Sequence, residues 1–259
     1  MAQIFNLDSY SKANIMYRWI KQEAIEQYVS EIKRYCGTNR MKQILDIGCG
    51  TGQFSIAFAE MAPECHIDAV DISTTQIEIV EQIKKEKNIC NISCYVIDFM
   101  KFNPANTYDI IILSEVIHLF DDLDLLFEKI VPFLNEGGVI FIRTPAPAQI
   151  MKRKSYNYFP RCRYIDLNRC KCQELIISAL AIYGRYAFSK IEVDESITIS
   201  CKQFIKGFEN KQYSTLYLIT QKEFNIGIEK MKKDLMECEN INSDFEMTGF
   251  FLKKESDNL

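Results

Sequence analysis

The sequence predicts an α/β protein built on a doubly wound, mostly parallel sheet. Short apolar runs alternate with helix-like stretches from residue 43 to residue 144. The first run leads into three glycines at alternate positions, and such a loop joins a strand to a helix in folds of this class. Another run, residues 108–116, has the unbroken apolar centre typical of a strand covered on both faces.

The elements follow in a regular order. An amphipathic helix is expected over residues 11–34, where apolar side chains recur at steps of three and four. The expected strands of the alternating region are residues 43–47, 66–72, 92–99, 108–116 and 139–144. The helices between them are expected to begin at residue 53, at a Ser73–Gln76 capping box, and at Asp121 or Asp122, the last helix closing at an "EGG" turn.

The regular alternation of strands and helices ends after residue 145. Residues 148–188 indicate a mostly helical segment that is too long for a simple connection. Alternation over residues 190–200 predicts one half-buried strand, and residues 201–212 fit a short helix. A Thr220–Glu223 capping box opens a further helix, and residues 245–254 predict the last strand.

These elements divide the chain into four parts. The first is an N-terminal helical lid, residues 1–40, and the second is a Rossmann-like core, residues 41–145. A helical cap insertion follows over residues 146–188. Residues 189–259 supply the remaining core strands and a second helical insertion at about 201–240; within it, residues 214–220 fit a strand or a loop.

Composition limits the class of protein. A chain of 259 residues is long enough for one large domain with insertions. A net charge of −4 gives no general reason to expect a nucleic-acid partner. The first residues lack the pattern of a signal peptide, and no apolar run approaches the about 20 residues of a membrane span. We therefore expect a cytoplasmic protein without a membrane partner, as a monomer or homodimer.

The ten cysteines are expected to be free thiols in such a protein. Cys162, Cys170 and Cys172 come closest to a metal-binding spacing. They lack a doubled C-x-x-C pattern, and the only histidines are His66 and His118. No metal site is expected.

The glycine loop, within "ILDIGCGTGQFS" (residues 44–55), carries the functional question. A dinucleotide-binding loop, G-x-G-x-x-G, would place the third glycine one residue later than Gly52. A P-loop would have a lysine after the last glycine, where this chain has Gln53. Asp71 and Asp98 close the second and third expected strands without a nearby cation. Two acids beside a glycine loop, with no lysine or arginine nearby, fit a ligand with a ribose and a free amine but no phosphate.

Over residues 44–145 the chain resembles the class I S-adenosylmethionine (SAM)-dependent methyltransferases. The segments that carry the resemblance, in chain order, are "LDIGCGTG", "AVDIS", "VIDFM", "YDIIILSEVIHLFDD" and "LNEGGVIFI". The resemblance implies a seven-stranded sheet whose last strand is antiparallel, and residues 245–254 suit that strand. It also implies that SAM is the cofactor and S-adenosylhomocysteine (SAH) the product.

The resemblance further implies which residues would hold the cofactor. Asp46 would hold the glycine loop, Asp71 would bind both ribose hydroxyls, and Asp98 would accept from the adenine amino group. Ile72 and Phe99 would flank the adenine. The other cofactor-binding residues would be Gly48, Cys49, Gly50 and Gly52 under the methionine moiety, Ser114 beside it, and Tyr10 as a lid. Alternatively, the two strand-end acids are turn residues, and Ile72 and Phe99 belong to the core.

Two residues beyond the fourth expected strand are candidates for catalysis. His118 carries an imidazole, which ordinarily titrates near neutral pH and suits a general base. Glu115 precedes it and is a candidate for substrate contact. Both have alternative interpretations, His118 as a structural residue and Glu115 as an acid at a helix start.

Substrate-binding candidates are more scattered: Tyr17, Arg143, Tyr156 and Arg161. Trp19 fits the core at its helical spacing, and Arg143 fits either a substrate carboxylate or a structural ion pair. Residues 152–171 carry seven basic residues and one acid, interleaved with aromatic residues. The segment fits recognition of an anionic partner or, as we prefer, a solvated helix face.

The sequence therefore predicts methyl transfer from SAM to an oxygen or nitrogen of a small organic acceptor by in-line displacement. The alternatives are a macromolecular acceptor, such as a carrier protein, a peptide or an RNA, and a cofactor-binding scaffold without catalysis. A nicotinamide-dependent oxidoreductase is disfavoured by the glycine spacing.

Overall fold

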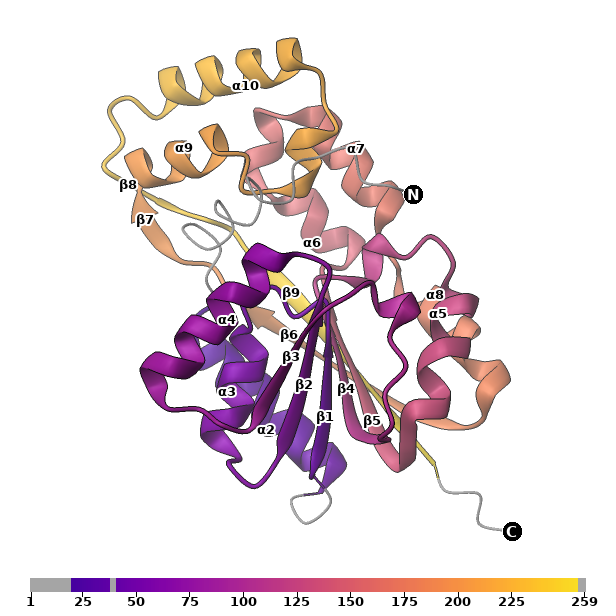
Figure 1. The fold of residues 1–259 in the computed structure, drawn as a ribbon. Helices are drawn as coiled ribbons and strands as arrows, with labels where there is room; N and C mark the ends of the chain where they lie inside the picture. The colour runs from indigo at the N-terminus through magenta and orange to yellow at the C-terminus, as the bar shows by residue number, and fades with distance from the viewer. Residues whose placement is uncertain (1–19, 38–40, 256–259) are drawn as a thin grey trace. The chain divides into compact units, whose positions relative to one another are not determined.

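The computed structural model describes residues 20–37 and 41–255, and they form two compact units (Figure 1). Of the described residues, the core unit holds Gln22–Thr144, Lys171–Val193 and residues 248–255. The insertion unit holds Pro145–Cys170 and Asp194–Met247. Tyr10, Tyr17 and Trp19 lie outside the described residues, as does the first part of the helix expected over residues 11–34.

The core unit is organised around a seven-stranded sheet of order β3-β2-β1-β4-β5-β9-β6. Its strands are β1 (Gln43–Ile47), β2 (His66–Asp71), β3 (Ile92–Val96), β4 (Tyr108–Ser114), β5 (Leu134–Thr144), β6 (Tyr186–Asp194) and β9 (Glu246–Lys254). Strands β1 to β5 pair in parallel, and β9, the last strand of the chain, runs antiparallel to β5. The predicted fold class is confirmed.

Helices cover both faces of this sheet. Figure 1 shows α2, α3 and α4 on one face and α5 and α8 on the other. Their bounds are α2 (Gln22–Cys36), α3 (Gln53–Met61), α4 (Thr74–Lys87), α5 (Leu123–Ile130) and α8 (Gln173–Leu180), with short 3-10 turns η1 (Phe99–Lys101), η2 (Ile117–Leu119), η3 (Val131–Phe133) and η5 (Ala181–Tyr183). Among the described residues, none of the helices has the length and apolar character needed to cross a membrane.

The helices start at the predicted caps, but only half of the expected Ser73–Gln76 capping box forms, because the N–H of Ser73 donates to Asp71 Oδ1 and not to Gln76. Ser73 accepts a hydrogen bond from the backbone N–H of Gln76, and Asp122 accepts from Asp124 and Leu125. Each cap satisfies N–H groups that have no partner within the helix. Helix α5 ends at Ile130, and a 3-10 turn containing Pro132 follows; Pro has no N–H to continue the helix. The "EGG" segment therefore lies within β5 and does not close the helix, which corrects the predicted strand start at residue 139.

Both faces of the sheet are packed with large side chains. On the face covered by α2 and α3, the rings of Tyr28 and Phe54 both pack on the ring of Phe141. Their ring centroids lie 5.4 Å and 5.6 Å from that of Phe141. On the other face, Phe127 of α5 and Ile176 of α8 are fully buried in one cluster. Burying such side chains stabilises the fold by roughly 1.5–3 kcal/mol each. This packing holds the carboxyl ends of β1, β2 and β4 in fixed positions.

The insertion unit has its own core. It contains α6 (Pro147–Lys152), η4 (Lys154–Asn157), α7 (Pro160–Arg169), β7 (Thr198–Ser200), α9 (Cys201–Glu209), η6 (Ser214–Tyr217), α10 (Gln221–Asp234) and β8 (Asn240–Asn242). Phe159 stacks on Phe208 at 5.4 Å between ring centroids. Gly227 lets α10 approach Phe159, because a Cβ at Gly227 would lie 2.3 Å from that ring.

The strand predicted over residues 190–200 is wrong as a single element. Strand β6 ends at Asp194, whose side chain accepts a hydrogen bond from the N–H of Ser196 at 2.8 Å and so forms a turn. Strand β7 then pairs with β8 in a separate two-stranded sheet. The insertion also differs from the expected range 146–188, since α8 packs on α5 and belongs to the core unit. Residues 214–217 form a 3-10 turn.

Candidate functional site

The glycine loop between β1 and α3 needs its glycines for two different reasons. Gly48, Gly50 and Gly52 all adopt positive φ angles, of 65°, 56° and 75°, which L side chains rarely adopt. A Cβ at Gly48 would lie 2.5 Å from Val116, and one at Gly52 would lie 2.8 Å from Val80. At Gly50 the nearest atom would be 4.0 Å away. The outer two glycines therefore permit close packing, whereas Gly50 leaves open space.

Asp71 ties the end of β2 to this loop. Its Oδ2 accepts a hydrogen bond from the N–H of Gly50 at 2.9 Å, and its Oδ1 accepts from the N–H of Ser73 at 2.9 Å. Burial raises the pKa of Asp71, and these two hydrogen bonds oppose the rise. A carboxylate has about four acceptor positions, so Asp71 keeps acceptor capacity for a ligand hydroxyl.

Asp46 lies beneath the loop and is 1% exposed. Its Oδ2 accepts a hydrogen bond from Ser55 Oγ of α3 at 2.6 Å, so the residue links β1 to the helix that follows the loop. Burial raises the pKa of Asp46 to about 7, and the hydrogen bond from Ser55 opposes the rise. Cys49 contacts its own loop through Sγ, 3.7 Å from the carbonyl oxygen of Gly50, and burial raises the pKa of its thiol.

The raised pKa of Asp46 predicts a pH-dependent stability. Between its ordinary value of 3.8 and about 7, the folded state binds this proton more tightly than the unfolded state does, so the contribution of Asp46 falls as pH rises through that window. Asp46→Asn should remove this dependence. The variant should match the wild type near pH 4 and exceed its unfolding free energy near pH 8, by up to about 4 kcal/mol. Urea unfolding across this range measures the difference; parallel profiles would contradict the prediction.

The predicted adenine side is only partly open. Ile72 follows β2 and is 58% exposed, so it is not a core residue. Asp98 is half-buried, and its Oδ1 accepts a hydrogen bond from the N–H of Met100 at 3.0 Å. Phe99 is 5% exposed and packs in the core cluster, while Met100 is 40% exposed. The prediction that Phe99 flanks the adenine is therefore corrected, because protein atoms already cover its ring.

Gln76 is a candidate site residue that the sequence did not single out. Its side chain is 3% exposed, and its Oε1 has no hydrogen-bond partner within the described part of the chain. That oxygen is also the atom nearest to the open space at Gly50. A buried polar atom without a partner costs free energy, which is typical of a group that meets a ligand. The sequence signal was a polar residue on the inner face of α4, one turn after Ser73.

The carboxyl end of β4 carries the catalytic candidates. Glu115 has a φ of 56°, unusual for a residue with a side chain, and its N–H donates to the carbonyl oxygen of Arg143 at 2.8 Å. His118 lies in η2 and is half-buried. Arg143 is buried, and its Nη1 donates to Ser114 Oγ at 3.3 Å. Ser114, Glu115 and Arg143 therefore meet where β4 and β5 end.

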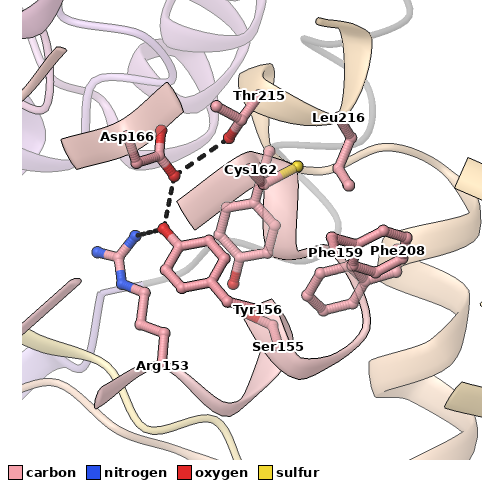
Figure 2. A pocket seen from close by; sticks show the side chains of 10 residues that line it. Arg153, Ser155, Tyr156, Phe159, Cys162, Asp166, Phe208, Thr215 and Leu216 are labelled. Atoms are coloured by element: carbon pink, nitrogen blue, oxygen red, sulfur yellow. Dashed lines mark hydrogen bonds between the residues drawn. The ribbon is translucent and has the colours of Figure 1, made fainter. Parts of the chain in front are cut away.

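Two predicted substrate residues, Tyr156 and Arg161, belong to the insertion unit. Tyr156 lines a cavity of about 20 Å³, which has room for about one water molecule. Figure 2 shows the Tyr156 side chain beside those of Arg153 and Asp166. The Tyr156 hydroxyl donates to Asp166 Oδ2 at 2.5 Å and accepts from Arg153 at 3.3 Å. Thr215 donates to the same Asp166 oxygen at 3.3 Å. Burial raises the pKa of Tyr156, which stays protonated.

The remaining candidates are peripheral or structural in their own units. Arg161 is exposed, with an Nη1 to Glu223 Oε1 distance of 3.9 Å, so its visible role is a loose surface ion pair. Cys162 is buried in the insertion core, and Cys170 contacts the carbonyl oxygen of Pro145. All ten cysteines are unbridged. No set of three or more potential metal ligands occurs in the portion of the chain that is described.

These features define a class of site. A parallel sheet leads from its first strand into a glycine loop, and the next strand ends in a carboxylate whose oxygens hold that loop. Doubly wound proteins bind nucleoside-containing ligands at this edge of the sheet. The open space at Gly50, the spare acceptor positions of Asp71 and the orphan oxygen of Gln76 fit the ribose of such a ligand.

Comparison with known proteins identifies the family. A family model described as a methyltransferase domain matches residues 38–236, and the chain belongs to this family. The expected resemblance to SAM-dependent methyltransferases is confirmed. The seven-stranded sheet and its antiparallel last strand are those that the resemblance implied.

Individual relatives differ in their acceptors. The chain is 32% identical over 168 residues to malonyl-[acyl-carrier protein] O-methyltransferase 1 of Ilyobacter polytropus, covering 65% of this chain and 54% of that one. It is 29% identical over 111 residues to (S)-tetrahydroprotoberberine N-methyltransferase of Eschscholzia californica, covering 42% and 32%. The chain thus spans about a third to about half of these relatives. The plantazolicin methyltransferase BpumL, solved with a pentazolic desmethylPZN analog and SAH, shares the fold at a TM-score of 0.58 and 16% identity, covering 91% of this chain and 87% of that one.

Proposed function

We propose that this protein transfers a methyl group from SAM to an oxygen or nitrogen atom of a small organic acceptor. The observation that carries the proposal is the glycine loop held by Asp71, with open space at Gly50. Membership of the methyltransferase-domain family supports the same cofactor. A cytoplasmic location and a monomeric or homodimeric state are part of the proposal.

The residues of the core unit have distinct roles in this proposal. Asp71 accepts hydrogen bonds from the ribose hydroxyls, and Gln76 supplies a further polar contact above the glycine loop. Ile72 and Met100 offer exposed apolar surface to the adenine, and Asp98 accepts from its amino group. SAM supplies an activated methyl group when bound, so the protein contributes alignment and exclusion of water.

Proton removal is the remaining chemical task. An oxygen or nitrogen acceptor often loses a proton as it is methylated, and a positioned base assists that loss. His118 and Glu115 are the groups at the end of β4 that can take this role. In this proposal Arg143, which is buried and donates to Ser114 Oγ, orients an acidic group of the acceptor. Tyr156 and Arg161 of the insertion unit stay sequence-based candidates for contact with the acceptor.

Calorimetric titration tests the cofactor assignment first. We expect SAM and SAH to bind and NAD not to bind. Methyl uptake by a panel of small amines, phenols and carboxylic acids would then identify the acceptor. Binding of NAD alone would overturn the proposal, and binding of SAM without any methyl uptake would favour a non-catalytic scaffold.

A carrier-protein acceptor is the second candidate. It is favoured by the similarity to malonyl-[acyl-carrier protein] O-methyltransferases. Docking of an acidic protein on the basic residues of α7 and its neighbours would be screened by salt. Turnover that falls steeply as salt rises would support this candidate, whereas turnover insensitive to salt supports a small acceptor.

His118→Ala should lower turnover without changing the affinity for SAM. Loss of a general base ordinarily costs about a hundredfold or more in rate. The chain offers a matched control in His66, which contacts Asp68 and Ser93 on β2 and β3. His66→Gln should leave turnover unchanged. Unaltered turnover in His118→Ala would remove His118 from the catalytic machinery.

Gln76→Leu should weaken SAM binding without loss of stability. The substitution removes a buried polar group that lacks a partner, so the melting temperature should stay level or rise. Loss of one hydrogen bond to the cofactor, about 0.5–1.5 kcal/mol, corresponds to an affinity lower by about two- to tenfold. Gln82→Leu, an exposed position on the same helix, is the control. Unchanged affinity in Gln76→Leu would contradict the role.

A further inference from the structure

Two cysteines of the insertion unit lie next to each other although they are far apart in the sequence. Cys201 is the first residue of α9, directly after β7, and Cys238 lies in the connection between α10 and β8. The β7–β8 register pairs Ser200 with Asn240. One step further along, the N–H of Cys201 donates to the carbonyl oxygen of Glu239 at 3.0 Å. This pairing places Glu239 opposite Cys201 and so brings the adjacent residue, Cys238, close to Cys201. Besides burial, the hydrogen bond and charge of Cys238 contribute to the raised pKa of Cys201.

The two thiols differ in their access to solvent. Cys201 is 3% exposed, whereas Cys238 is exposed. Burial, and next the hydrogen bond with Cys238, raise the pKa of Cys201 to about 11, so its thiol stays protonated at neutral pH. A small oxidant therefore meets Cys238 first. The Sγ of Cys238 also lies 3.0 Å from the carbonyl oxygen of Asn240, a contact that holds the thiol near β8.

We propose that Cys201 and Cys238 are a redox-sensitive pair that forms a reversible disulfide when a hydroperoxide oxidises Cys238. In the first step the Cys238 sulfur takes one oxygen from hydrogen peroxide, the O–O bond breaks, and a sulfenic acid and water result. In the second step the Cys201 sulfur attacks that sulfur, the S–O bond breaks, and a second water leaves with the thiol proton. Overall, two thiols and one peroxide give one disulfide and two waters.

The bond would change the mechanics of the insertion unit. It would close a covalent loop around α9, η6 and α10, joining the start of α9 to the connection after α10. Such a crosslink limits the opening of the enclosed segment. The oxidised protein should therefore resist proteolysis between residues 201 and 238 more than the reduced protein does. The inference does not depend on the proposed methyl transfer.

Peptide mapping under non-reducing conditions tests the pair. The full chain is treated with a small excess of hydrogen peroxide, remaining thiols are alkylated, and the peptides are analysed by mass spectrometry. We expect a crosslinked peptide containing Cys201 and Cys238, lighter by two hydrogen atoms than its two parts and released by dithiothreitol. Cys90 is the other exposed cysteine, and Cys90→Ser should leave the crosslink unchanged.

Variants separate the pair from general oxidation. Cys238→Ser should abolish the crosslink and leave the proteolysis rate insensitive to peroxide. Cys201→Ala should leave Cys238 to accumulate as sulfinic acid; if this variant does not fold, Cys238→Ser alone decides. Accumulation of sulfinic acid at Cys238 in the wild type, with no bond to Cys201, would overturn the proposal. A disulfide from Cys238 to any other cysteine would overturn it as well.

Discussion

Asp71→Ala is expected to weaken SAM binding by about 1.5–3 kcal/mol, because two hydrogen bonds from ribose hydroxyls to a charged acceptor are lost. This corresponds to an affinity lower by about 10- to 150-fold. The same carboxylate also receives the N–H groups of Gly50 and Ser73. The substitution therefore removes a ligand contact and a support of the loop together.

An analogue of SAH without ribose hydroxyls separates the two effects. If Asp71 contacts the ribose directly, Asp71→Ala should weaken the binding of SAH much more than that of its 2′,3′-dideoxy analogue. Equal losses for both ligands would mean that Asp71 acts only through the loop. Unchanged binding of SAH would show that the ribose lies elsewhere. Calorimetry on wild type and variant with both ligands gives all four affinities.

Local signals account for what the sequence predicted well. The Thr220–Glu223 capping box forms as expected, because it depends on residues three positions apart. Of the expected Ser73–Gln76 box only the Ser73 half forms, since the N–H of Ser73 donates to Asp71 and not to the Gln76 side chain. The glycine loop was also predicted from a short stretch of sequence, since closely spaced glycines directly after a strand indicate a tight turn. The unbroken apolar centre of β4 indicated a strand covered on both faces, and Ile110 to Leu113 are all fully buried.

Errors arose where non-local packing decides. The alternation over residues 190–200 is genuine, yet a turn at Asp194 sends its second half to pair with β8, about forty residues later. Phe99 is buried and Met100 is exposed because the 3-10 turn η1 directs one side chain into the core and the next outward. Periodicity carries neither fact. The orphan oxygen of Gln76 likewise depends on what surrounds it in space.

The variants Gly48→Ala and Gly50→Ala should separate the effect of the loop on protein stability from its effect on SAM binding. Both replace a glycine with positive φ, which costs roughly 1–2 kcal/mol. At Gly48 the new methyl group would also meet Val116 at 2.5 Å, and such overpacking adds about 1–3 kcal/mol. At Gly50 no such clash exists, since the nearest atom is 4.0 Å away. Gly48→Ala should therefore be the less stable variant in urea unfolding.

For SAM affinity the order of the two variants should be the opposite, with Gly50→Ala the more affected. A methyl group at Gly50 fills the space that we assign to the ligand, so a Gly50→Ala protein that is still folded should lose most of its SAM binding. Gly37→Ala is the matched control, because Gly37 also has a positive φ of 85° and has nothing within 4 Å of its missing Cβ. It should show the backbone cost alone and normal binding. Among the described residues, no protein atom lies closer than 4.0 Å to a Cβ at Gly50, so only the cofactor would clash with the added methyl group. If Gly50→Ala binds SAM as tightly as Gly37→Ala does, the cofactor does not lie over this loop.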